Sequence, residues 1–304
     1  MTTQMEVMPQ TPQQTQQKYQ KPSVGATIGG TLAGLAVNSV ATTPAKVISP
    51  KLMENMENLS NSLSADEFVQ VKNVIEDSVK TTGLADKGVE ILRAGSDNAE
   101  VIKNIMAKEL NKGVAKFLPA PIKDAMAVSS AEQVEWGKNA FYAMESKKIV
   151  LPEKALSLAG FHEMGHALNA NKSLFGKMLQ KCRGLGALAF PIALISLIKT
   201  KKAPGEKPEG KLDKVTTFIK NNAGKLTFAA FLPMLLEEGL ATIKGNKIAK
   251  NTLSKELARK VAKSNALGFS TYFALAALSS VGIWAANKIK DKIAQPKPIQ
   301  NTVS

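Results

Sequence analysis

Residues 158–169 read LAGFHEMGHALN and contain a His-Glu-x-x-His motif. The chain of 304 residues has only two histidines, and both of them, His162 and His166, lie in this stretch. Residues four apart project from the same face of an α-helix, so the two imidazoles can bind one metal ion. Glu163 follows the first histidine, where its carboxylate can reach a metal-bound water and act as a general base. Gly165 leaves room on this helix for close packing or for substrate.

A catalytic zinc site usually has three protein ligands and one water, and no third histidine exists here. The acidic pair Glu237-Glu238 ends an apolar stretch, where a carboxylate is costly to bury unless a positive charge such as zinc compensates it. Either carboxylate is therefore a candidate third ligand, and the thiol of Cys182 is a less plausible one. Ala241 and Thr242 are small and share a face with Glu238, so this helix can approach the histidine helix closely.

The residues before the histidine helix predict two short strands around a turn, over 139–143 and 148–151, and Pro152 ends the second strand. A free strand edge beside such a helix can pair with an extended peptide. We therefore expect a substrate-binding edge strand formed by Lys148, Ile149, Val150 and Leu151.

In these features the chain resembles the gluzincins, which combine the two histidines of His-Glu-x-x-His with a glutamate from a later helix. More narrowly, it resembles the membrane zinc metalloendopeptidases related to the bacterial heat-shock protease and the CAAX prenyl endopeptidases. Those proteins have Asn-Ala-Phe/Tyr before a strand, then His-Glu-x-Gly-His, apolar segments and Glu-x-x-Ala-Asp. Residues 139–141, 149–151, 162–166 and 238–242 stand in these places, and the resemblance covers roughly residues 139–245.

The resemblance implies that His162, His166 and Glu238 bind zinc and that Glu163 is the general base. It favours Glu238 over Glu237, because an alanine follows Glu238 at the third position. Thr242 stands where many relatives have an aspartate, although a related group of bacterial membrane zinc peptidases has serine there. The carboxylate that usually supports a ligand from behind is thus missing, and we expect Glu237, together with Thr242, to take this place.

The net charge of +15 is compatible with nucleic acid, with an anionic membrane or with the flanks of membrane segments. Aromatic residues make up only 5% of the chain, and the lysines cluster beside apolar runs, which favours a membrane over nucleic acid. One cysteine excludes an intrachain disulfide framework. We therefore expect an integral, multi-pass membrane protein in contact with lipids.

The pattern along the chain predicts six regions. They are a disordered tail over 1–22, a Gly-rich possible membrane segment over 23–50, a helical region over 51–130, a metallopeptidase core over 131–250 with an apolar hairpin of 184–198 and 226–236, a transmembrane helix over 266–286 and a disordered tail over 295–304. We expect Pro44 and Pro50 to break the chain, Ser64 and Glu67 to form a capping box, and Val89–Arg93 to be helical.

Together these features predict a mainly α fold, with a zincin-like helical core, a short β-hairpin before the histidine helix and membrane-associated helices. The expected function is hydrolysis of a peptide or protein substrate by a zinc-activated water, more as an endopeptidase than as an exopeptidase. Tyr142 is a weak candidate for the group that assists zinc in the transition state. The alternative is a non-enzymatic, basic membrane scaffold with a chance motif, and bound zinc would distinguish the two.

Overall fold

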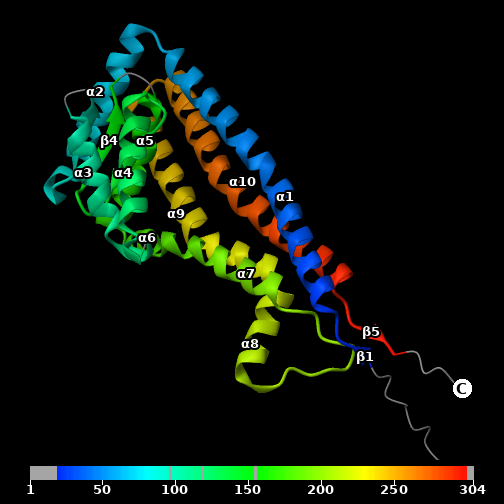
Figure 1. Cartoon of the computed structure of the whole chain (residues 1–304). Coiled ribbons are helices and arrows are strands. Elements are labelled where there is room, and N and C mark those ends of the chain that lie inside the picture. Colours follow the sequence, from blue (N-terminus) through cyan, green and yellow to red (C-terminus); the bar gives the residue numbers. More distant parts are fainter. Residues whose placement is uncertain (1–18, 96–97, 118, 154–155, 300–304) are drawn as a thin grey trace, which may run out of the picture.

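The computed structural model describes residues 19–95, 98–117, 119–153 and 156–299 (Figure 1). Its helices are α1 (Val24–Asn61), α2 (Ala65–Thr81), α3 (Ala99–Leu110), α4 (Ala120–Glu135), α5 (Gly160–Lys172), α6 (Leu174–Cys182), α7 (Ala189–Ile198), α8 (Gly210–Asn221), α9 (Ala223–Thr252) and α10 (Lys255–Ile293), with 3-10 turns η1 (Ala85–Lys87), η2 (Gly113–Phe117), η3 (Ser157–Ala159) and η4 (Arg183–Leu188). Its strands are β1 (Tyr19–Gln20), β2 (Glu90–Ala94), β3 (Phe141–Ala143), β4 (Lys148–Pro152) and β5 (Lys297–Pro298). The described chain is mainly helical, as predicted.

Three parts follow one another along the molecule in Figure 1. The head consists of α2 to α6 and a three-stranded sheet. The stalk consists of α1, α7, α9 and α10, with α1 and α10 packed along each other and α9 packed on α10. The foot consists of residues 19–23, 199–225 and 287–299, where the short strands β1 and β5 pair antiparallel.

The sheet in the head has the order β2-β4-β3, with β2 parallel and β3 antiparallel to β4. Side chains of β4 alternate between two cores. Ile149 and Leu151 pack with α2 and α5, whereas Val150 packs with α3 and α4 on the other face. The histidine helix α5 is therefore fixed from behind by a well-packed apolar core.

The prediction of an edge strand over Lys148–Leu151 is wrong, because β4 is the central strand and has a partner on both sides. The run Ile149-Val150-Leu151 is fully buried, and a continuous apolar run is typical of a strand that is covered on both faces. The prediction of a helix over Val89–Arg93 is also wrong, because Glu90–Ala94 form the strand β2, which supplies one of these two partners. The conformation of β2 is decided by its pairing with β4, which lies 58 residues later in the chain. Glu90 lies opposite Lys148 in this pair, and Lys148 Nζ donates to Glu90 Oε2.

The predicted break at Pro44 and Pro50 is also wrong, since α1, which is 38 residues long, contains both prolines and continues to Asn61. Packing along α10 provides the stability that an isolated helix would lose at a proline. By contrast, the capping box is confirmed: the backbone N–H of Glu67 donates to Ser64 Oγ, and the N–H of Ser64 donates to Glu67 Oε2. Of the predicted tails over 1–22 and 295–304, residues 1–18 and 300–304 lie outside the described residues. Within the described parts, Tyr19–Gln20 and Lys297–Pro298 pair as short strands.

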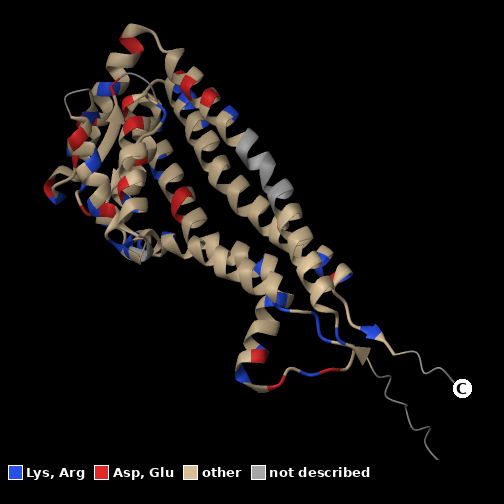
Figure 2. Cartoon of the chain, in the orientation of Figure 1, with Lys and Arg blue, Asp and Glu red and all other residues tan. Residues whose placement is uncertain are grey.

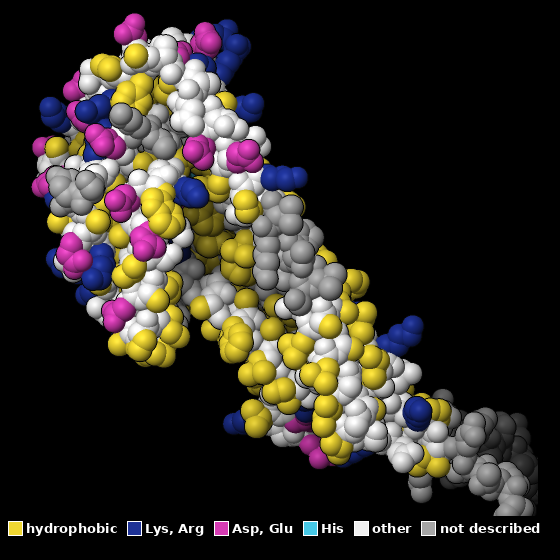
Figure 3. Space-filling view, turned by 45° about the horizontal axis from the view of Figure 1, so that its top comes forward, with side chains coloured by type: hydrophobic (Ala, Val, Ile, Leu, Met, Phe, Trp, Pro, Cys, Tyr) yellow, Lys and Arg dark blue, Asp and Glu magenta, His cyan; other side chains and the backbone are white. Residues whose placement is uncertain are grey.

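Three helical stretches are long and apolar enough to cross a membrane: Leu174–Ile198, Ala223–Thr252 and Lys255–Ile293. The first joins α6, η4 and α7, so the predicted apolar segment 184–198 is part of a longer helical run. Figure 2 shows that the charges of the stalk gather mainly towards its two ends. Phe190 is 75% exposed and Ile198 is 61% exposed, and apolar side chains cover much of the stalk surface in Figure 3. Lipid could cover this surface without leaving backbone polar groups unsatisfied, because the helices bond these groups internally.

Two glycines bring α5 and α9 into backbone contact. A Cβ atom on Gly165 would lie 2.1 Å from the carbonyl oxygen of Ala241, and one on Gly245 would lie 2.4 Å from the carbonyl oxygen of Phe161. Neither backbone can move away without separating the helices. The small residues expected on α9 therefore lie against α5, and this contact places Glu237 and Glu238 opposite the histidines.

Replacing Gly165 with Ala should lower the free energy of unfolding by about 1–3 kcal/mol, because the added methyl group must push α9 away from α5. The measurement is unfolding of the full chain in detergent, followed by circular dichroism. The control is Gly239→Ala in α9, where the added atom would meet only Phe269 at 3.8 Å. Equal stabilities of the two variants would show that the close contact is not required.

Candidate metal centre

The histidines of α5 and a glutamate of α9 converge on one point. The Nε2 atoms of His162 and His166 lie 3.0 Å apart, and Glu238 Oε2 lies 3.0 Å from the first and 3.5 Å from the second. Three ligands at about 2.0–2.2 Å from a tetrahedral zinc ion are separated by similar distances, about 3.3–3.5 Å. All three side chains are buried. This group could therefore hold a metal ion.

The opposite nitrogen of each imidazole faces an oxygen of α9. His166 Nδ1 lies 2.8 Å from Glu237 Oε1, so this nitrogen carries the proton and donates it to the carboxylate. The Nε2 of a neutral His166 then has a free lone pair. His162 Nδ1 lies 3.3 Å from Thr242 Oγ1, which accepts its proton in the corresponding tautomer. Both rings thus present Nε2 acceptors to the shared point, which is the arrangement that a metal ion needs.

Glu237 is held in a dense network rather than at the shared point. Its Oε1 accepts hydrogen bonds from Asn169 Nδ2 and Gln180 Nε2, each at 3.0 Å. Its Oε2 accepts one from Arg183 at 2.9 Å, and the other end of the same guanidinium donates to Glu238 Oε1. Arg183 therefore bridges the two glutamates and leaves Oε2 of Glu238 free to face the histidines.

The buried carboxylates also attract positive charge to the shared point. Glu163, Glu237 and Glu238 are buried together, and Arg183 neutralises only one of these three carboxylates. A proton on His166, or a divalent ion bound to the neutral imidazoles in its place, would compensate the charge that remains. Burial acts to lower the pKa of His166, but the carboxylates of Glu238 and Glu237 outweigh it and raise the pKa to about 10. The same carboxylates would favour a metal ion, which competes with the proton for Nε2.

Glu163 lies beside this group but is not one of its members. Among the described residues, no side-chain hydrogen bond engages its carboxylate, although the residue is only 6% exposed. Burial raises the pKa of this carboxyl group, while the neighbouring His166 and His162 oppose the shift. A buried carboxylate without protein partners is available to accept a proton from a small ligand.

Other residues considered in the sequence lie elsewhere. Lys148, Ile149, Val150 and Leu151 form the central strand behind α5 and offer no edge to a substrate. Cys182 ends α6 and does not belong to the metal-binding group. Tyr142 accepts a hydrogen bond from Asn171 Nδ2 at 2.8 Å near the end of α5.

The structure adds four residues that the sequence did not single out: Asn169, Gln180, Arg183 and Tyr272. Asn169 had a visible signal, because it follows His166 by three positions on the same helical face. Arg183 also had a signal in the sequence, because it is a charged residue directly before the uncharged run 184–198. Tyr272 comes from α10, and its ring lies 5.9 Å from the guanidinium carbon of Arg183, which no local pattern indicates.

Comparisons with protein-family models, with curated proteins and with solved structures find no match for this chain. The case for the metal centre therefore depends on the geometry and chemistry of its own residues.

Glu237→Gln should lower the affinity for Zn²⁺ by about 10–100-fold, because the neutral amide supports His166 less well as a ligand. Glu238→Gln should lower it much further by removing a direct ligand. The measurement is competition with a chelator of known affinity, using the full chain in detergent. Glu54→Gln, at an exposed site on α1, is the control. An equal loss in Glu237→Gln and Glu238→Gln would make Glu237 a direct ligand, and no loss in the former would remove its supporting role.

Proposed function

We propose that this protein is a membrane-embedded zinc metallopeptidase. The observation that carries the proposal is the convergence of His162 Nε2, His166 Nε2 and Glu238 Oε2. The carboxylate of Glu163 lies beside them and has no hydrogen-bond partner among the described side chains. Side chains from two helices, 72 residues apart in the chain, meet in the arrangement that metal-assisted hydrolysis requires. Two imidazoles and one carboxylate form a donor set of catalytic zinc sites, and the adjacent carboxylate of Glu163 suits zinc-assisted hydrolysis.

Zinc in this place would lower the pKa of a bound water to about 7 and polarise the carbonyl of the substrate. Glu163 then accepts the proton of the attacking water and delivers it to the leaving amine. Glu237 and Thr242 hold the imidazoles so that each Nε2 faces the reaction centre. Arg183 fixes both glutamates and compensates part of their charge.

The position of the site along α9 supports a substrate at or in the membrane. Glu237 follows Gly224, near the foot, by 13 residues, which correspond to about 20 Å of helix. The hydrocarbon core of a bilayer is about 30 Å thick. If the stalk crosses a bilayer from the foot, the catalytic group lies within its thickness, towards the head. Figure 3 shows a hollow between head and stalk, lined largely by apolar side chains, on this part of the molecule. We infer that peptide segments entering from the bilayer or its surface are the substrate class.

Glu163→Gln should lower the rate of peptide hydrolysis by at least about 100-fold, because the general base is lost while the metal ligands remain. The test compares cleavage of labelled casein and of a labelled transmembrane peptide by the full chain in detergent, with the zinc content of each sample measured. Glu54→Gln is again the control. Retained hydrolysis in a clean preparation of Glu163→Gln would reject the mechanism, and wild-type protein that binds no zinc would favour the scaffold alternative.

A further inference from the structure

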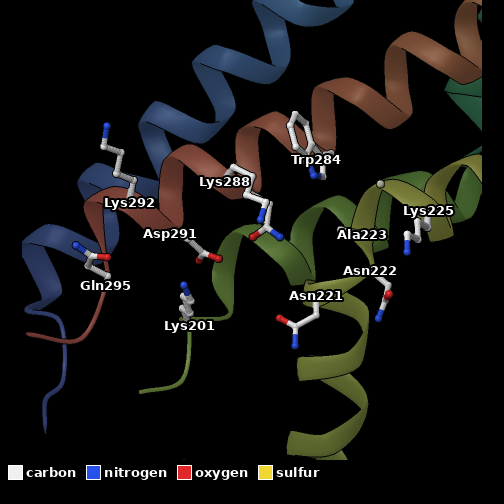
Figure 4. Close-up of a pocket in the computed structure, with 12 residues that line it drawn as sticks. Lys201, Asn221, Asn222, Ala223, Lys225, Trp284, Lys288, Asp291, Lys292 and Gln295 are labelled. Carbon is white, nitrogen blue, oxygen red and sulfur yellow. The ribbon is translucent and has the colours of Figure 1, made fainter. Parts of the chain in front are cut away.

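A basic cavity lies at the foot, at the start of α9, whereas the metal centre lies near the middle of that helix (Figure 4). Its volume is about 390 Å³, and it is bounded by the loop after α7, the start of α9 and the end of α10. Lysines from all three segments line it: Lys201, Lys225, Lys288 and Lys292. In Figure 4, Lys288 lies between Lys201 at one end and Lys225 at the other, whereas Lys292 extends away from them.

The positive charge of this cavity is not used within the described part of the chain. Lysines outnumber acidic residues at the foot by roughly three to one. The acids pair with other lysines: Asp291 with the buried Lys220, and Asp213 with Lys199 and Lys202. None of the four lining lysines has an ion pair to a described residue, so the cavity offers strong attraction to an anion.

The start of α9 adds to this attraction. The N–H of Leu226 is bonded back to Asn222, so the N–H groups of residues 223–225 precede the first bond of the helix and lack partners within it. Ala223, Gly224 and Lys225 line the cavity. The positive end of the helix dipole therefore coincides with the lysines.

An apolar groove continues from the same cavity along the stalk. It also measures about 390 Å³, shares Gly224, Lys225 and Trp284 with the cavity, and continues past Phe228 and Val281. Trp284 is 56% exposed at the junction, where indole rings are favoured at a membrane interface. A ligand that filled both spaces would have an anionic head and an apolar body, the two properties of an anionic phospholipid.

We propose that this cavity binds the phosphate headgroup of an anionic phospholipid, with an acyl chain in the groove between α9 and α10. The lipid would fix the foot at one membrane surface, so that the head and the metal centre lie towards the other. This inference depends on membrane insertion of the stalk and is independent of peptidase activity.

The test is native mass spectrometry of the full chain in mild detergent, titrated with dioleoyl phosphatidylglycerol and, separately, dioleoyl phosphatidylcholine. The wild type should bind phosphatidylglycerol more tightly. The variant K201Q/K225Q/K288Q should lose at least about tenfold in affinity for it, since each lysine near a membrane surface contributes about fivefold. The control is K207Q/K211Q/K214Q, which removes the same charge from exposed positions at the foot outside the cavity and should bind like the wild type.

Three results would overturn the proposal. Equal losses in the two triple variants would show diffuse attraction without a site. Equal binding of the two lipids by the wild type would show that the protein does not distinguish an anionic headgroup from a zwitterionic one. Displacement of phosphatidylglycerol by glycerol phosphate or inorganic phosphate at similar concentrations would show a site for soluble anions. If the first triple variant fails to fold, Lys288→Gln alone tests the site, with a loss of about fivefold expected and an unchanged affinity contradicting it.

Discussion

Two adjacent carboxylates, Glu237 and Glu238, are completely buried in the middle of a helix that is apolar enough to cross a membrane. Burying them without compensation would cost several kcal/mol per charge. Several polar groups contact the two carboxylates within hydrogen-bond distance: two imidazoles from α5, an amide each from Asn169 and Gln180, and the guanidinium of Arg183. These carboxylates raise the pKa of His166 to about 10, and a divalent ion bound to the neutral imidazoles would replace that proton and compensate the same charge.

The sequence allowed several residues of this centre to be predicted, but not the hydrogen bonds and ion pairs that join them. The pairing of His162 and His166 could be predicted, because it depends only on the geometry of one helix. The acidic pair in an apolar run could be recognised, because burying a charge without compensation is costly. Glu237 was expected to replace a carboxylate that the resembling family has in place of Thr242, and in the structure its Oε1 lies 2.8 Å from His166 Nδ1. Arg183 directly precedes the apolar segment 184–198 in the sequence, and only the fold shows that its side chain bridges both glutamates.

The errors in the fold have a common cause. A short apolar run such as Ile149-Val150-Leu151 indicates a strand, but whether that strand is central or at an edge depends on β2, which lies far away in the sequence. Prolines indicate breaks only for a helix without support, and α1 has α10 along its length. Contacts between distant segments decided each of these cases, whereas the capping box at Ser64 and Glu67 was correctly predicted because it is wholly local.

The central claim is that two histidines and one glutamate together bind zinc, and X-ray absorption at the zinc edge of the wild-type full chain tests it most directly. The account predicts two imidazole nitrogens at about 2.0–2.1 Å and one or two oxygens at about 2.0–2.2 Å, with no sulfur. A spectrum with oxygen ligands alone, with sulfur from Cys182, or with no bound zinc would contradict it.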